Sequence, residues 1–300
     1  MIEAAVLGRV GIDLYPDELR TPLREVRHYT RYVGGFAGNM ATGLARLGVQ
    51  TAIVSRVGDD GHGEFVRDFL EAEGVDCRYL SVDREWGTPP TFCEIWPPDN
   101  FPLTFYRKPT APDWQLQTRH FDADEIAAAQ LLYATGTGLA QSPSRETTLA
   151  ALLGHRGGTS VFDLDWRPAL WDDPNEYPEL AREASALSDV VVGNREEVAA
   201  AGGLDILLEL APTVILKRGG DGAVLYDGGE VVDVPGMPVE VMNGLGAGDA
   251  FGAALGYAIV RGIGLREGLE LANRAGAWVA QRIPCSEAMP RLADLTEVHV

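Results

Sequence analysis

Short apolar runs rich in β-branched residues alternate along this chain with longer segments in which apolar residues recur at helical spacing. The expected strands are Ala4–Gly8, Thr51–Ser55, Leu131–Ala134, Ser160–Leu164, Val190–Val192, Thr213–Leu216 and Ala223–Tyr226. The expected helices are Ala37–Leu47, Gly63–Glu73, Ser144–His155, Glu179–Leu187, Arg195–Ala201, Gly248–Val260 and Arg266–Arg282. This alternation predicts an α/β fold with a mostly parallel sheet and helices on both faces. Several helices follow glycine-rich turns, where such sheets place ligand sites.

Two segments interrupt the alternation. Leu14–Val33 and Arg84–Lys108 contain β-prone pieces punctuated by proline, notably Thr91–Trp96 and Leu103–Arg107, which do not suit crossover helices. We expect them to pair into a small second sheet, either as a lid over a substrate cleft or as two hairpin excursions on the surface. Residues 1–300 are therefore interpreted as one domain, with a lid formed by about residues 14–33 and 84–108.

Composition narrows the class of partner. The 300 residues suffice for one large core, since a chain of this size buries about 75% of its unfolded surface. The formal net charge of −19 would repel a phosphate backbone, so nucleic acid is not expected as a partner.

Cysteine usage and the apolar runs predict a cytoplasmic protein. Cys77, Cys93 and Cys285 are far apart and form no C-x-x-C pair, so they are interpreted as free thiols in a reducing compartment. The chain starts directly with the strand-like run Ile2–Leu7, without the pattern of a signal peptide. Apolar runs such as Phe251–Val260 are too short for a membrane span.

The clearest chemical signal is the glycine turn Asn243–Gly248, followed by Asp249 and an apolar helical run. Glycine allows close backbone approach, and the first amides of a helix can hold a phosphate or a developing negative charge. The amides of Gly246, Ala247 and Gly248 are thus a candidate anion hole. Asp249 is either the N-cap of the helix or a base that accepts a proton from a substrate hydroxyl.

Other common motifs are missing from the sequence. Neither of the two lysines, Lys108 and Lys217, follows a glycine, which excludes a Walker loop, and no strand is followed by G-x-G-x-x-G. The serine hydrolase motif G-x-S-x-G is also absent. A P-loop NTPase, an ordinary dinucleotide dehydrogenase and a hydrolase with a Ser-His-Asp triad are therefore disfavoured.

Two further glycine clusters are candidates for ligand contacts. Gly34–Asn39 begins a helix and is either a plain turn and cap or a group that presents amides and a carboxamide to sugar hydroxyls. Lys217–Ala223 lies between two strands and is either a hairpin turn or part of a nucleotide site.

Four motifs in order resemble the PfkB or ribokinase family of carbohydrate kinases over nearly the whole chain. They are Gly34–Asn39, Asn194-Arg195-Glu196-Glu197, Lys217–Ala223 and Gly246-Ala247-Gly248-Asp249. The resemblance implies a three-layer ribokinase-like α/β core with a small β-sheet lid. It also implies a kinase that uses ATP and Mg²⁺, and a homodimer that forms through the lids.

Stretches outside these motifs resemble the 5-dehydro-2-deoxygluconokinases within that family. They are Gly8–Leu14, Tyr106-Arg107, Gly136–Glu146, Phe162–Pro168 and Ser286–Pro290. The resemblance implies phosphorylation of the 6-hydroxyl of 5-dehydro-2-deoxy-D-gluconate. Kinases of 2-keto-3-deoxygluconate share the Asp-x-Asx-x-Arg pattern, so that substrate, fructose or another sugar stays open. A non-catalytic sugar or nucleotide sensor is the alternative from another class.

The resemblance also assigns roles to residues. Asp249 would be the base, beside the anion hole. The residues implied for the substrate are Asp13, Gly34, Gly35, Asn39, Arg107, Asp165 and Arg167. Those implied for the nucleotide are Lys217, Gly219, Gly222 and Asn273, while Asn194 and Glu197 would organise magnesium indirectly, through water or phosphate.

Two of these assignments carry alternatives. Arginine's planar fork suits a sugar-acid carboxylate, but Arg107 could also be an unpaired surface residue. Asn194 could simply be the N-cap of the following helix. Asn243 stands where many family members have Asp, which bears on a possible monovalent cation at the turn.

Overall fold

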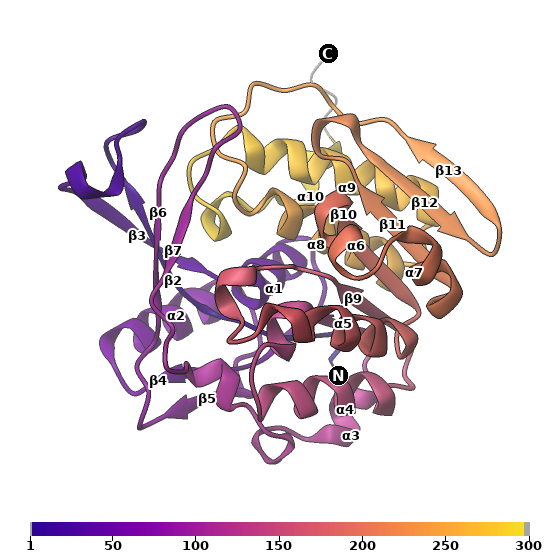
Figure 1. The fold of residues 1–300 in the computed structure, drawn as a ribbon, viewed down its shortest axis with the longest axis horizontal. Coiled ribbons are helices and arrows are strands. Elements are labelled where there is room, and N and C mark those ends of the chain that lie inside the picture. The colour runs from indigo at the N-terminus through magenta and orange to yellow at the C-terminus, as the bar shows by residue number, and fades with distance from the viewer. Residues whose placement is uncertain (1, 297–300) are drawn as a thin grey trace.

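The computed structural model describes residues 2–296 and contains two sheets, one large and one small (Figure 1). The strands are β1 (Ala4–Leu7), β2 (Gly11–Pro16), β3 (Tyr29–Gly34), β4 (Thr51–Gly58), β5 (Leu80–Asp83), β6 (Pro90–Cys93), β7 (Leu103–Phe105), β8 (Leu131–Thr135), β9 (Thr159–Asp163), β10 (Val190–Asn194), β11 (Thr213–Lys217), β12 (Ala223–Asp227) and β13 (Glu230–Val234). The helices are α1 (Phe36–Arg46), α2 (Gly61–Ala72), α3 (Ala123–Ala127), α4 (Ser144–Gly154), α5 (Tyr177–Ala186), α6 (Arg195–Ala200), α7 (Leu204–Leu210), α8 (Ala247–Val260), α9 (Leu265–Ala280) and α10 (Leu292–Thr296).

The large sheet has nine strands in the order β13-β12-β11-β10-β9-β8-β1-β4-β5. Its pairs are parallel from β11 to β5, whereas β12 and β13 are added antiparallel at the other edge. The expected mostly parallel sheet and all seven expected strands are confirmed.

Helices cover both faces of this sheet because the strands bury both faces. In β1, Ala4 and Val6 belong to one core, with apolar residues of α1, α2, α8 and α9. Ala5 and Leu7 belong to the other, with residues of α3, α4, α5, α6 and α7. Successive side chains of a strand point to opposite faces, so near-continuous apolar runs feed two helical layers. The result is the expected three-layer core.

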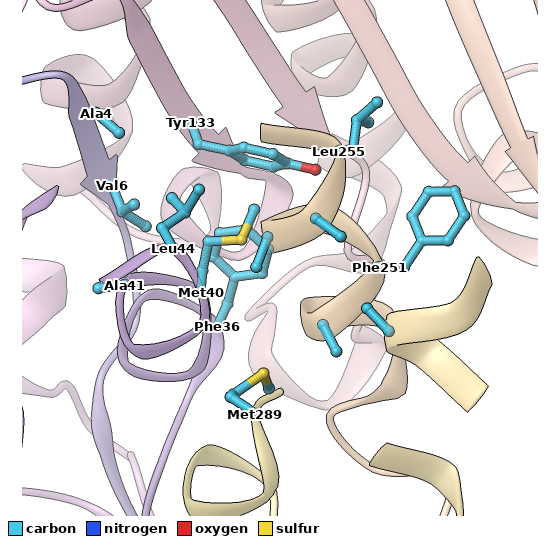
Figure 2. Packing of buried hydrophobic residues seen from close by; sticks show 14 of the residues in the cluster. Ala4, Val6, Phe36, Met40, Ala41, Leu44, Tyr133, Phe251, Leu255 and Met289 are labelled. Carbon is cyan, nitrogen blue, oxygen red and sulfur yellow. The ribbon is translucent and has the colours of Figure 1, made fainter. Parts of the chain in front are cut away.

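The first core packs α1 against α8 beneath the sheet. Phe36, Met40 and Leu44 of α1 extend toward Tyr133 of β8 and Leu255 of α8 (Figure 2). The contact needs a small residue in α8, since a Cβ at Gly252 would lie 2.8 Å from the terminal carbon of Met40. This packing fixes the starts of both helices relative to each other, and both starts carry residues predicted for the site.

The small sheet contains four strands in the order β3-β2-β6-β7 and stands beside the large one, in indigo and purple at the left of Figure 1. Strand β2 pairs antiparallel with β3 and parallel with β6, and β6 pairs antiparallel with β7. The expected second sheet is confirmed, although β2 begins at Gly11, before the predicted segment.

Candidate active site

The glycine turn before α8 has the geometry of an anion-binding helix start. Gly246 is the N-cap residue in the left-handed conformation, with φ 80°. A side chain there would be strained, and its Cβ would also lie 2.9 Å from the Cβ of Cys285. Within residues 2–296, the amides of Gly248 and Asp249 donate to no acceptor. Both therefore remain free for an anion.

The side chain of Asn243 stabilises this turn through two hydrogen bonds to the backbone. This side chain is fully buried. The carboxamide nitrogen donates to the carbonyl of Ile283 at 2.6 Å, and the carboxamide oxygen accepts from the amide of Leu245 at 3.0 Å. The residue that replaces the family's usual Asp thus holds backbone on both sides.

Asp249 lies in the first turn of α8, and Gly246 is the N-cap, so the alternative that Asp249 caps the helix is wrong. Its carboxylate accepts a hydrogen bond of 2.6 Å from the side-chain amide of Asn39, on α1. Burial raises the pKa of Asp249 to about 6, although Asn39 and the positive charges of Arg9 and Arg167 act in the opposite direction. A carboxylate with a raised pKa beside free amides can act as a general base.

Asp13, on β2 of the small sheet, shares the electrostatic neighbours Arg9 and Cys285 with Asp249. It is buried, and burial raises its pKa to about 6. Gly34 leaves room for the Asp13 side chain, because a Cβ at Gly34 would lie 2.1 Å from Cγ of Asp13. Gly35 lets the backbone pass close to Arg9, because a Cβ there would lie 2.7 Å from the carbonyl oxygen of Arg9. The structure therefore places Asp13 against Gly34, and Gly34 and Gly35 immediately precede the helix that carries Asn39; the two glycines act by their lack of a side chain.

The two arginines predicted for the substrate differ in their surroundings. Arg107 is 3% exposed, forms an ion pair with Asp113 at 2.5 Å and stacks on Trp114 at 4.4 Å. The alternative of an unpaired surface arginine is therefore wrong. Arg167 keeps 41% of its side chain exposed and lies 3.3 Å from Asp165 and 3.9 Å from Glu197.

Asp165 has an uncommon backbone conformation, with φ 32°. Its amide donates to Asp163 at 3.1 Å, and its carboxylate accepts from the hydroxyl of Thr137 at 2.9 Å. These bonds hold the loop after β9, with Asp165 and Arg167, at the carboxyl edge of the sheet.

A buried charge cluster joins this loop to the second glycine turn. Nζ of Lys217, at the end of β11, lies 2.9 Å from Asp163 and 3.8 Å from Glu197. Burial raises the pKa of Asp163, with Lys217 opposing the shift. Burial alone would lower the pKa of Lys217, but Asp163 and Glu197 raise it above its usual value. A Cβ at Gly248 would lie 3.9 Å from Nζ of Lys217, so the ammonium group faces the anion-binding turn.

A cavity of about 260 Å³ opens beside Lys217. Gly219, Gly222 and Asn273 line it together with Lys217 and Gly248, so all four residues predicted for the nucleotide surround one space. Gly222 has φ 92°, and a Cβ there would lie 2.1 Å from the carbonyl of Val234. Asn273 donates to the carbonyl of Pro235 at 3.1 Å and so ties the wall of the cavity to α9.

Asn194 and Glu197 form a capping box at the start of α6. The amide of Glu197 donates to the Asn194 side chain at 2.9 Å, and the amide of Asn194 donates to the Glu197 carboxylate at 2.8 Å. The alternative that Asn194 is an N-cap is thereby confirmed. In the part of the chain that the structure describes, no group of three or more His, Cys, Asp or Glu residues could hold a metal ion.

Two residues of the site were not among those predicted from sequence, Arg9 and Asp163. Each stands at or just after the carboxyl end of a buried strand, β1 for Arg9 and β9 for Asp163. Ligand-binding groups of α/β sheets gather at the carboxyl ends of the strands, so this position in the sequence could have identified both residues as candidates.

Two sugar kinases of known structure have similar folds. A fructokinase from Vibrio cholerae, solved with fructose, ADP and calcium, superposes with a TM-score of 0.87 at 28% identity over 98% of each chain. An uncharacterised sugar kinase from Pyrococcus horikoshii, solved with ATP, gives 0.85 at 28% identity over 97% of this chain and 96% of that one. The fold and the site thus define a ribokinase-like sugar kinase.

The chain belongs to the pfkB family of carbohydrate kinases, whose family model matches residues 1–292. A curated relative from Shouchella clausii, named 5-dehydro-2-deoxygluconokinase, is 34% identical over 98% of this chain and 94% of its own length. Among residues 2–296, none of the helices has the length and apolar character needed to span a membrane.

Proposed function

We propose that this chain transfers the γ-phosphoryl group of ATP to the 6-hydroxyl of 5-dehydro-2-deoxy-D-gluconate. One observation carries the proposal. The carboxylate of Asp249 stands at a helix start with two free amides, and the adjoining cavity is lined by Lys217 and Gly248. The full-length likeness to kinases named for this substrate supports the choice of sugar acid.

In the proposed reaction Asp249 accepts the proton of the substrate hydroxyl. The hydroxyl oxygen forms a bond to the γ-phosphorus as the bond between that phosphorus and the bridging oxygen of ADP breaks. Free amides of the Gly246–Asp249 turn and the ammonium of Lys217 stabilise the negative charge on the transferred group. Asp13 and Asn39 hold sugar hydroxyls. Asp165 and Arg167 line the substrate site on the side of the large sheet.

The cavity beside Lys217 is proposed to take the nucleotide. Gly222 lines it, and the absence of a side chain there lets the turn pack against the backbone of Val234. Bound Mg²⁺ would neutralise the phosphate charges during transfer. Asn194 and Glu197 would act on the ion only through water or phosphate, because their polar groups already form the capping box.

We propose that the small sheet is a lid, since its strand β2 carries Asp13 into the site. The lid is also the proposed surface of a homodimer. Tyr29, Phe92 and Tyr106 form an aromatic row across it, with neighbouring ring centroids 5.4 Å apart, and Tyr106 is exposed. The net charge of −19 supports small-molecule substrates over nucleic acid.

A substrate panel tests the proposed function. ADP release with ATP and Mg²⁺ is expected to show the highest kcat/KM with 5-dehydro-2-deoxygluconate, above 2-keto-3-deoxygluconate, fructose and ribose. Preference for one of the other three would replace the substrate while keeping the kinase. Binding of ATP without turnover of any of them would contradict the proposal and favour a sensor.

The pH dependence of turnover is a second expectation. Only the ionised carboxylate of Asp249 can accept a proton, and its pKa is raised to about 6, so kcat is expected to fall as the pH drops through that value. Below it, the ionised fraction falls about tenfold per pH unit. Saturating Mg²⁺ keeps ATP in one ionic form during the measurement. An acid limb near the ordinary aspartate value of 3.8 would contradict this role.

A further inference from the structure

Arg9 occupies the turn between β1 and β2, and its backbone is fixed on two sides. The carbonyl oxygen of Arg9 accepts a hydrogen bond of 2.8 Å from the amide of Ala37, in the first turn of α1. Gly35 leaves room for that carbonyl, because any Cβ there would collide with it. The side chain of Arg9 therefore starts from a rigid point at the carboxyl edge of the large sheet.

The guanidinium of Arg9 lies among the groups of the proposed sugar site. It is 5.6 Å from the ring centroid of Phe105, on β7 of the small sheet. Its charge opposes the rise in the pKa of Asp13 and of Asp249 and helps to lower the pKa of Arg107. Arg9 thus lies beside Phe105 of the lid strand, and its charge acts on both carboxylates.

This guanidinium has no partner of its own in the described chain. Within residues 2–296, the Arg9 side chain donates no hydrogen bond and forms no ion pair, and its Nε is buried without an acceptor. The carboxamide oxygen of Asn39, which is bound to Asp249 through its nitrogen, is likewise buried without a donor. Unpaired buried polar atoms are costly, so such a group indicates a polar ligand.

The other two arginines near the site already have carboxylate partners. Arg107 is paired with Asp113, and Arg167 with Asp165 and Glu197. Binding a substrate anion through either would require sharing a guanidinium with a protein carboxylate. Among these three arginines, Arg9 is the one without a carboxylate partner within residues 2–296, so a substrate anion can pair with it directly.

We propose that Arg9 binds the carboxylate of the sugar acid and so sets the preference for acids over neutral sugars. The inference rests on the proposed function. A carboxylate can take two parallel hydrogen bonds from a guanidinium. A neutral ketose offers only uncharged oxygens to the guanidinium, and hydrogen bonds from arginine to a carboxylate are roughly twice as strong as those between neutral groups.

The test compares Arg9→Met and Arg9→Lys with the wild-type enzyme on 5-dehydro-2-deoxygluconate and on fructose. Arg266→Met is the matched control, because that arginine is exposed on α9 with only a loose contact of 3.9 Å to Glu270. With the acid, Arg9→Met is expected to lower kcat/KM about 30-fold or more, mainly through KM. With fructose kcat/KM stays within about threefold, and Arg9→Lys recovers part of the loss with the acid.

Two further readouts separate this role from a structural one or an effect on the base. Calorimetric titration with the sugar acid alone, without ATP, is expected to show weaker binding to Arg9→Met at an unchanged melting temperature. The acid limb of the kcat profile is expected to move to higher pH in Arg9→Met, because the charge of Arg9 no longer opposes the rise in the pKa of Asp249. Equal losses with acid and fructose, or a limb shifted to higher pH with unchanged acid binding, would overturn the proposal.

The wild-type enzyme tests the proposed function independently. If it neither binds nor phosphorylates the sugar acid, the proposed function fails. If it does both and Arg9→Met behaves like Arg266→Met, the proposed function stands and the role of Arg9 is refuted.

Discussion

Replacing Asp249 with asparagine is expected to lower kcat about 10²- to 10⁴-fold, the usual contribution of a general base. The substitution keeps the shape of the side chain and removes the proton acceptor. The free amide of Gly248 does not depend on the Asp249 side chain, and the cavity beside Lys217 does not include Asp249, so ATP binding should persist. ADP release at saturating ATP and sugar acid gives kcat, and calorimetric titration gives the affinity for ATP.

The control for this variant is Asp68→Asn, which neutralises an exposed carboxylate on α2. It should leave both kcat and nucleotide affinity unchanged. The carboxamide introduced at position 249 can still accept from Asn39, so the melting temperature of the main variant should lie close to that of the wild type. Retention of more than about a tenth of the wild-type kcat would show that another group accepts the proton.

The second large effect concerns stability. Lys217→Met is expected to lower the free energy of unfolding by about 3–5 kcal/mol near neutral pH, because removing one partner of a buried ion pair leaves an uncompensated charge. Lys217 keeps 14% of its side chain exposed and Asp163 only 5%. Urea unfolding monitored by tryptophan fluorescence measures the difference between variant and wild type.

The destabilisation by Lys217→Met is expected to depend on pH, because Asp163 can take up a proton. Without Lys217, a neutral Asp163 avoids the cost of a buried charge, and burial already raises its pKa. The destabilisation should therefore become smaller as the pH falls and Asp163 takes up a proton. The double variant Asp163→Asn with Lys217→Met should recover part of the lost stability for the same reason.

Lys108→Met is the matched control, since it removes the chain's other lysine. Lys108 pairs with Asp172 at 2.8 Å, but its side chain is 57% exposed. An exposed pair contributes about 0–1 kcal/mol, so little change is expected. An equal decrease in the free energy of unfolding of the two lysine variants would contradict the view that burial makes the Lys217–Asp163 ion pair important for stability.

The pattern of apolar positions predicted most of the core elements. Strand β10 and helix α6 illustrate why: a buried apolar run ends at Asn194, and the side chain of Asn194 caps the helix with Glu197 three residues later. Both signals are local in sequence. Strands β5 and β13 and helices α3, α7 and α10 were not predicted; β13, an exposed edge strand, and α7 each bury few residues and carry a weak periodic signal.

The sequence by itself determined the α/β class, the second sheet, the family and the turn that begins α8, because each depends on local periodicity or on a short ordered motif. The tertiary structure decided which charges are paired. Asp113 neutralises Arg107 and Asp163 neutralises Lys217, whereas Arg9 has no hydrogen-bond or ion-pair partner within residues 2–296. These residues are brought together from different strands and loops, and pairing depends on distances of a few ångströms between side chains that sequence spacing does not fix.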